Sequence, residues 1–159
     1  MNPLMYGVSM AIDQYNMKPC RPEDIPAIIR LEARWLTEDS TIGMAPVSAD
    51  DVRAWLGPFC WLAERDGEVV GFAYATIESS EGLAVIPAGA RYLRLEELYV
   101  LPDYRNQGIG GRLVDRLLAE ASAQGITRGR VYSSSKDWRR IEGFYQRHGF
   151  QMWYVELYR

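Results

Sequence analysis

The chain has 159 residues, of which 48% are hydrophobic and 25% charged, and its formal net charge is −3 at pH 7. This length fits one domain with a substantial core, and the hydrophobic fraction excludes an intrinsically disordered protein. The negative charge argues against a nucleic acid partner, because binding to phosphates needs a basic surface. No apolar run approaches the roughly 18 residues of a membrane-spanning helix, so we expect no membrane partner.

The cysteine pattern indicates the compartment. Cys20 and Cys60 have no CxxC spacing and no histidine cluster nearby. A disulfide scaffold and a zinc site are therefore disfavoured, and we expect no metal and a reducing, cytoplasmic location. Residues 1–16 lack the pattern of a signal peptide. Residues 1–13 have weak periodicity and are predicted to be an N-terminal arm that precedes a single domain over residues 14–159.

Local signals in the first half predict one strand, two helices and a hairpin. Pro22 suits the start of a helix, because its missing N–H costs nothing there. Ser48 is a good N-cap for a second, short helix. Asp66-Gly67 predicts a tight turn between two strands. In chain order, these elements are a strand at residues 14–21, a helix from 22 to about 36, a loop at 37–47, a helix that reaches 56, and strands at 60–65 and 68–77.

The second half alternates strands with helices after a long loop. Gly125 and Gly149 are predicted to end the two helices, and Asp137 to cap the second. The buried face of that second helix is predicted to consist of Trp138, Ile141, Phe144 and Tyr145. In chain order, the elements are a loop at residues 78–90, a strand at 92–101, a helix at 108–124, a strand at 130–134, a helix at 138–148 and a final strand at 150–158. The order predicts an α/β fold around a mixed sheet.

Residues 93–113 are the most informative segment, in which a strand ends at residue 101 and a turn contains Pro102 and Asp103. Glycines open the helix that follows it, and a helix N-terminus offers unpaired N–H groups and a positive dipole end to an anion. The motif does not match GxGxxG, because Leu113 occupies the third glycine position, and no Walker sequence is present. It matches RxxGxG, formed by Arg105, Gly108 and Gly110, although the glycines alone are also consistent with a simple tight turn.

Three segments together resemble the GNAT superfamily of acetyl-CoA-dependent N-acetyltransferases. They are KPCRPEDIPAI at residues 18–28, LEELYVLPDYRNQGIG at 95–110 and GFYQRHGF at 143–150. They occur in the family's order and spacing from residue 18 to the C-terminus. The resemblance implies the α/β GNAT fold, in which a mixed, mostly antiparallel central sheet is flanked by helices and splayed between the fourth and fifth strands.

The resemblance also implies that acetyl-CoA is the acyl donor and lies in that gap. Its pyrophosphate would bind the backbone of residues 107–110, and its pantetheine arm would pair with the backbone of Leu98 and Val100 as an added strand does. Either of those N–H groups would also bind the oxyanion. The predicted cofactor-binding residues are Leu98, Tyr99, Val100, Arg105, Asn106, Gln107, Gly108, Ile109, Gly110 and Gly111.

Amine acetylation needs a base for the amine and an acid for the leaving thiolate. In polyamine acetyltransferases, which have a similar LEE sequence, the first acid is the proposed base, and this implies Glu96. Strand alternation predicts that Glu97 points to the opposite face, toward solvent or an arginine such as Arg94 or Arg130. The resemblance implies that Tyr145 protonates the thiolate.

One position departs from the family pattern. Where many relatives have an asparagine seven residues before this tyrosine, the chain has Trp138. Asp137 or Ser135 then replaces the asparagine, or the contact is missing. His148 at a helix C-terminus is predicted to be structural.

The acceptor is predicted to be the primary amine of a small molecule or peptide, which attacks acetyl-CoA directly in a ternary complex. Glu38 and Asp39 are candidates for a negative rim that attracts the amine, although such acids also cap helices. The alternative is a non-catalytic, GNAT-like module that binds acyl-CoA as a sensor. The aromatic final strand would pack on the sheet, and its outer face would allow a homodimer.

Overall fold

The computed structural model describes residues 14–159, so the predicted arm over residues 1–13 lies outside the described residues. One five-stranded sheet has the neighbour order β1-β2-β3-β4-β5. The first four strands pair antiparallel, and β5 runs parallel to β4. The strands are β1 (Asn16–Pro19), β2 (Cys60–Arg65), β3 (Glu68–Ser79), β4 (Arg91–Val100) and β5 (Gly129–Val131). The helices are α2 (Ile25–Thr37), α3 (Ala49–Trp55), α4 (Ile109–Ala123) and α5 (Trp138–Gln146), with single 3-10 turns at Pro22–Asp24 and Pro102–Tyr104.

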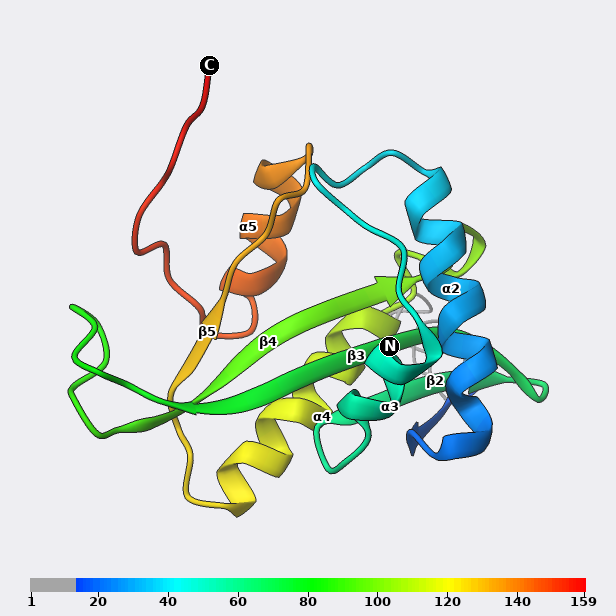
Figure 1. Ribbon diagram of the computed structural model, residues 1–159, viewed down its shortest axis with the longest axis horizontal. Helices are drawn as coiled ribbons and strands as arrows, with labels where there is room; N and C mark the ends of the chain where they lie inside the picture. The colour runs from blue at the N-terminus through cyan, green and yellow to red at the C-terminus, as the bar shows by residue number, and fades with distance from the viewer. Residues whose placement is uncertain (1–13) are drawn as a thin grey trace, which may run out of the picture.

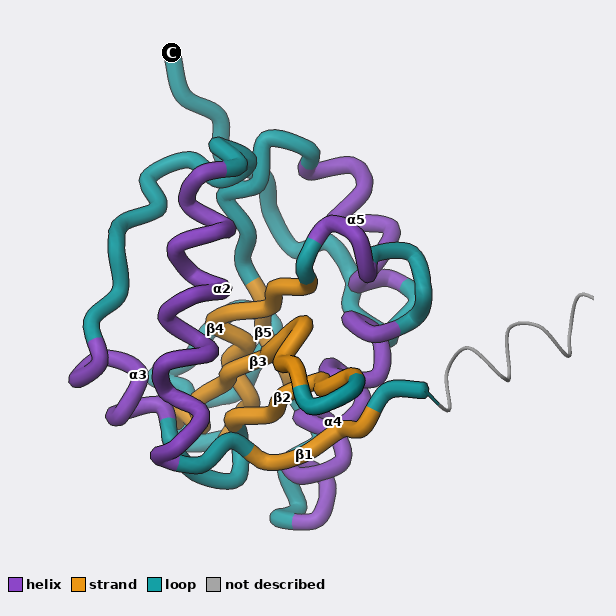
Figure 2. The backbone as a smooth tube through the Cα atoms, turned by 90° about the vertical axis from the view of Figure 1, so that its right-hand side faces the viewer, coloured by secondary structure: helices purple, strands orange, loops and turns teal. Residues whose placement is uncertain are grey.

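Helices cover both faces of the sheet. In Figures 1 and 2, α2 and α3 lie on one side, and α4 and α5 lie on the other. Ile28 and Leu31 of α2 pack against Phe72 in one core cluster, while Leu113 and Leu117 of α4 lie in the second. The predicted α/β fold is therefore confirmed. Within residues 14–159, no helix is both long and apolar enough to cross a membrane.

The local signals act as predicted at the turns and caps. The Ser48 side chain accepts a hydrogen bond from Asp51 N, and the Asp51 carboxylate accepts one from Ser48 N in return. Asp66 and Gly67 both have positive φ, at 52° and 81°, which is the backbone that a tight hairpin turn requires. These positions show that the sequence specifies the connections as well as the strands.

The sheet splays where the family resemblance implied. β5 pairs with β4 only at Leu93, Arg94 and Leu95. Beyond that point the chain of β5 leaves the sheet, because the Ser134 carbonyl accepts a hydrogen bond from Ile42 N in the loop after α2. This second partner also makes β5 shorter than the predicted strand at residues 130–134. The later half of β4 therefore has β3 on one side and an open edge on the other.

The predicted final strand is wrong. After α5 the chain forms no helix or strand, and in both views it runs away from the body of the domain (Figures 1 and 2). Phe150 remains attached, since its N–H donates to the Tyr145 carbonyl and its ring packs near Gly129. Trp153 and Tyr154 are exposed, because an alternating sequence becomes a strand only when it pairs with a neighbour, and β5 offers an edge of three residues.

Candidate active site

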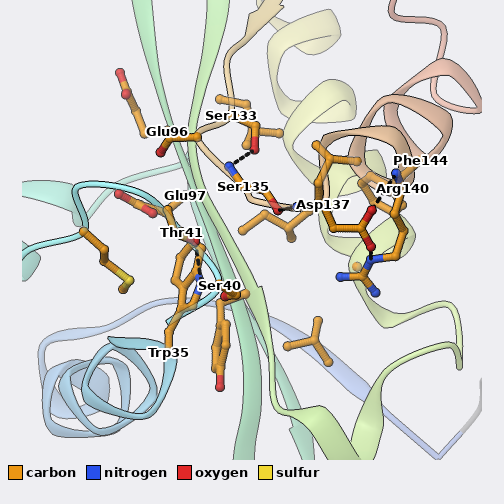
Figure 3. Close-up of a pocket in the computed structure, with 18 of the residues that line it drawn as sticks. Trp35, Ser40, Thr41, Glu96, Glu97, Ser133, Ser135, Asp137, Arg140 and Phe144 are labelled. Atoms are coloured by element: carbon orange, nitrogen blue, oxygen red, sulfur yellow. Dashed lines mark hydrogen bonds and ion pairs between the residues drawn. The ribbon is translucent and has the colours of Figure 1, made fainter. Parts of the chain in front are cut away.

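A cavity of about 1410 Å³ lies beside the open edge of β4 (Figure 3). Its walls come from α2 and the loop that follows, from the later half of β4, from the start of α4, from the serines at 133–135 and from α5. The volume exceeds the roughly 300–1,000 Å³ of most small-ligand pockets. There is room for a large ligand and a second, smaller one.

The start of α4 forms an anion-binding cradle at one end of this cavity. Gly108 has φ 81° and is the N-cap, and the first helical hydrogen bond runs from Arg112 N to the Gly108 carbonyl. Helix geometry therefore leaves the N–H groups of Ile109, Gly110 and Gly111 without intrahelical acceptors. All three residues line the cavity, as does Asn106. The cradle matches the predicted phosphate site.

The Arg105 side chain forms contacts within the protein that the sequence did not reveal. Its Nη2 lies 2.9 and 2.8 Å from the two carboxylate oxygens of Glu38, and its Nε donates to the Val100 carbonyl at 2.8 Å. The Tyr99 hydroxyl donates to the same Glu38 carboxylate at 2.6 Å. Glu38 thereby ties the end of α2 to the turn before α4.

Two predicted contact residues are absent from the cavity wall. Arg105, Tyr99 and Asp39 line the cavity, but Glu38 and Gln107 do not. Glu38 is bound to Arg105 and Tyr99, and Gln107 Oε1 accepts from the Tyr15 hydroxyl at 2.6 Å. Asp39 pairs with Lys136 at 2.8 Å and is largely exposed. Glu38 therefore joins α2 to the turn before α4, and its contact with the acceptor stays a prediction.

The backbone of β4 is available where a pantetheine arm would pair. Leu101 N donates to the Val70 carbonyl on the β3 side. Because N–H groups alternate in direction along a strand, those of Leu98 and Val100 point to the other side, toward the gap. Leu98, Tyr99 and Val100 all line the cavity. The geometry suits both backbone roles that the resemblance implied.

A β-bulge brings both neighbouring glutamates into the cavity. Tyr74 of β3 pairs with Glu97, and the next residue, Ala75, pairs with Leu95, so Glu96 is one extra residue in β4. A bulge disrupts side-chain alternation and re-aims side chains. Glu96 and Glu97 both line the cavity and lie on the same side of it in Figure 3. The prediction that Glu97 faces away is wrong, since the alternation rule assumes an unbroken ladder.

The two carboxyl groups have different surroundings. Glu96 accepts from Thr76 Oγ1 at 3.1 Å and from the Tyr132 hydroxyl at 3.3 Å, and it pairs with Arg94 Nε at 3.3 Å. For Glu97, burial, together with the charge of Glu96, raises the pKa to about 7. Glu97 thus has the proton affinity of a base that works near neutral pH.

Tyr145 lies close enough to Glu97 to sense its charge. The side chain is buried between Phe144 and Phe150, whose rings lie 5.0 and 5.6 Å from its own. Burial, and then the negative charge of Glu97, raise the pKa of Tyr145 above its ordinary value. The phenol therefore stays protonated at neutral pH, as a proton donor must. Tyr145 lines the cavity.

Glu32 is a cavity residue that the sequence analysis missed. It lies on α2 between Ile28 and Trp35, on the apolar face, and is 4% exposed. Burial, followed by the charge of Glu97, raises the pKa of Glu32 to about 8. A charged residue at helical spacing within an apolar stripe was the signal that could have found it.

The remaining candidates have mainly structural contacts. Trp138 is 53% exposed, which corrects its predicted place on the buried face of α5. Asp137 caps α5 through Arg140 N at 3.4 Å and lines the cavity with Ser135. His148 Nδ1 lies 3.0 Å from Asp115 Oδ1, in agreement with a structural role. The described part of the chain contains no cluster of His, Cys, Asp or Glu that could hold a metal ion.

Comparison with known proteins identifies the family that this fold and cavity define. Residues 57–152 match the Acetyltransferase (GNAT) domain. The chain therefore belongs to the GNAT acetyltransferase family. This finding confirms the resemblance that the three sequence segments carry.

Individual relatives share moderate sequence identity with this chain. The chain is 30% identical over 126 residues to phosphinothricin N-acetyltransferase of Alcaligenes faecalis, across 74% of this chain and 60% of that protein. It is 33% identical over 107 residues to mycothiol acetyltransferase of Streptomyces coelicolor, across 64% of this chain and 30% of that protein. The matched part thus spans less than two thirds of either relative.

Solved structures share the fold. A predicted acetyltransferase from Clostridium acetobutylicum, crystallised with acetyl-CoA, superposes with a TM-score of 0.69 at 22% identity. The match covers 91% of this chain and 96% of that one. At this identity the likeness establishes the GNAT fold, and the chemistry of this chain depends on its own residues.

Proposed function

We propose that the chain is an N-acetyltransferase that moves an acetyl group from acetyl-CoA to the primary amine of a small molecule or peptide. One observation carries this proposal: a single cavity joins an anion cradle, an open strand edge, a base and an acid. The cradle is the start of α4, and the edge is that of β4 at Leu98 and Val100. Glu97 and Tyr145 supply the base and the acid.

The reaction follows from these positions. The pyrophosphate of acetyl-CoA binds the α4 N–H groups, and the pantetheine amides pair with β4. Glu97 accepts a proton from the acceptor ammonium, and the free amine attacks the thioester carbonyl, whose oxyanion an N–H of β4 stabilises. The C–S bond breaks as the tetrahedral adduct collapses, and Tyr145 gives its proton to the thiolate. The nitrogen loses its extra proton through solvent, and a proton from solvent returns the Tyr145 phenolate to the phenol. No acyl-enzyme forms in this sequence.

The base in this proposal is Glu97 in place of Glu96. The carboxylate oxygens of Glu96 already have an arginine and two hydroxyl groups as partners. Glu97 has a pKa of about 7 and fewer polar partners than Glu96. The negative charge that raises the pKa of Tyr145 also belongs to Glu97.

The test combines binding with turnover. Acetyl-CoA should raise the melting temperature, since a ligand that binds only the folded state adds about 2.7 kcal/mol at a hundredfold excess over its Kd. A panel of amines should then release CoA. Stabilisation without turnover on any amine would favour the acyl-CoA sensor instead. If acetyl-CoA caused no stabilisation and no amine released CoA, both functions would be contradicted.

A homodimer and a cytoplasmic location are also part of the proposal. The exposed apolar side chains after α5 support the first, because such a segment gains from pairing with a second copy. The free thiols of Cys20 and Cys60 support the second, since a reducing compartment preserves them. Light scattering on the full chain tests the dimer: a molecular mass of one chain at micromolar concentration would contradict it.

A further inference from the structure

Glu32 is a buried carboxyl group with an unused oxygen. It lies in the middle of α2 and is 4% exposed, and its Oε1 has no hydrogen-bond partner in the described structure. Buried polar atoms nearly always have a partner, because removing one from water without compensation costs free energy. Since Glu32 lines the cavity, its unused oxygen is suited to bind a donor group of the ligand that enters there.

The charge around Glu32 is negative. Glu97 is near enough for its charge to raise the pKa of Glu32, and Asp51 lines the same cavity. Asp51 is occupied with Ser48 at the start of α3. Two carboxyl groups in one buried region repel each other, and a cation between them relieves that repulsion.

Most cationic side chains of the cavity are engaged with other acids. Arg105 pairs with Glu38 at 2.8 Å, Lys136 with Asp39 at 2.8 Å, and Arg140 with Asp137 at 3.6 Å. Arg147 also lines the cavity but directly precedes His148, whose ring packs against Gly111 at the anion cradle. Arg105, Lys136 and Arg140 are therefore paired with acids other than Glu32.

Aromatic rings also line the cavity. Trp35 stacks on Tyr99 with ring centroids 5.2 Å apart, and its Nε1 donates to Thr41 Oγ1 at 3.1 Å. Trp55 of α3 stacks on Tyr74 at 5.0 Å. Both tryptophans line the cavity. The face of an indole ring attracts cations, so these rings and the carboxyl groups favour the same kind of ligand.

We propose that Glu32 binds a second positively charged group of the acceptor, so that the acceptor is a small amine with two cationic ends, such as an alkyl diamine. The inference rests on the proposed function, in which Glu97 serves the end that is acetylated. The bound ammonium group favours the ionised form of Glu32, so that each positive charge of the acceptor meets one carboxylate. The same carboxylates repel an acceptor that carries a carboxylate at its far end.

Three acceptors of equal chain length test the proposal: butylamine, its terminal diamine, and the amino acid with a carboxylate at the far end. We expect kcat/KM to be at least about tenfold higher for the diamine than for butylamine, mainly through KM, and lowest for the amino acid. Glu32→Gln should remove the advantage of the diamine, so that the diamine and butylamine have similar kcat/KM. Glu23→Gln, an exposed site ahead of the same helix, is the matched control and should keep the advantage.

Equal kcat/KM for butylamine and the diamine in the wild-type protein would overturn the inference without any variant. A Glu32→Gln variant that loses activity equally on all amines would also overturn it, because that result indicates a general structural role. Calorimetric binding of the same amines to the CoA complex separates the two proposals. Tight binding of the diamine without acetyl transfer would contradict the proposed function alone.

Discussion

Two adjacent carboxyl groups on β4 differ in what surrounds them. Arg94, Thr76 and Tyr132 hold Glu96, whereas burial and the charge of Glu96 raise the pKa of Glu97 to about 7. A base must lose its proton readily at the working pH and accept another from the substrate. At the scale of single residues, these surroundings support the proposal that the second glutamate of the pair is the base.

Exchange of each glutamate for glutamine tests this assignment. Glu97→Gln should lower kcat/KM at pH 7 by about 10²–10⁴-fold, because an alkyl ammonium with a pKa near 10 then loses the base that accepts its proton. Activity should partly recover as the pH rises and the free amine accumulates. Glu96→Gln should have a smaller effect. The measurement is kcat/KM across pH 6–9 on one acceptor, and equal profiles for the two variants would contradict the assignment.

Tyr145→Phe removes the proton donor and keeps the packed ring. We expect kcat to fall by about 10²–10⁴-fold, with little change in the affinity for acetyl-CoA, since the phenol acts on the leaving thiolate. Steady-state kinetics and calorimetry measure the two quantities separately. An unchanged kcat would mean that solvent, and not Tyr145, protonates the thiolate.

At the scale of elements, we expect the binding of acetyl-CoA to depend on the N-terminus of α4. A Cβ at Gly110 would lie 3.6 Å from Phe144, which is ordinary contact, so Gly110→Val should fold. Its side chain would crowd the anion cradle, and the stabilisation by acetyl-CoA should disappear. Gly143→Val in α5 is the control, as its Cβ would meet only the end of Arg147 at 3.9 Å. A normal melting shift in Gly110→Val would place the phosphates elsewhere.

Elements with strong local signals could be predicted from the sequence, and those that depend on a distant partner could not. The Ser48 cap and the Asp66-Gly67 turn are made by neighbouring residues. The bulge at Glu96 depends on the register between β3 and β4, which no local pattern specifies. The final strand failed for the same reason, because pairing with β5 decides it and β5 turns away toward the loop after α2.

The candidate site follows the same division. Gly108, Gly110 and Tyr145 were predicted as site residues from contiguous motifs, and all three line the cavity. Glu32 lies about 65 residues before Glu97 in the chain, and only the folded sheet brings these two acids to one cavity. The ion pair between Glu38 and Arg105 is also a tertiary contact, so the sequence did not reveal it, and Glu38 was predicted to bind the acceptor.

At the scale of the whole molecule, the buried acids couple folding to pH. The pKa values of Glu32 and Glu97 rise from 4.5 to about 8 and about 7. The folded protein therefore keeps protons that the unfolded chain releases above about pH 4.5. Stability falls as the pH rises through that window, because the unfolded state there binds fewer protons.

Glu32→Gln should flatten this dependence. Each unit of pKa displacement corresponds to about 1.4 kcal/mol, and each kcal/mol to about 2–4 °C in a domain of this size. We therefore expect the variant to melt at least about 4 °C above the wild-type protein at pH 8.5 and near it at pH 4.5. Calorimetric melts at both pH values measure this difference. Equal differences at the two pH values would mean that Glu32 titrates normally.

The central claim is that one cavity holds acetyl-CoA and an amine together and transfers the acetyl group between them. The most direct measurement is mass spectrometry of a reaction that contains the protein, acetyl-CoA and the amine panel, with free CoA assayed in parallel. We predict an N-acetylated amine and CoA in equal amounts, and no acetylated protein intermediate in a sample without amine. CoA release without an acetylated amine, or an acetyl group that remains on the protein, would contradict direct transfer.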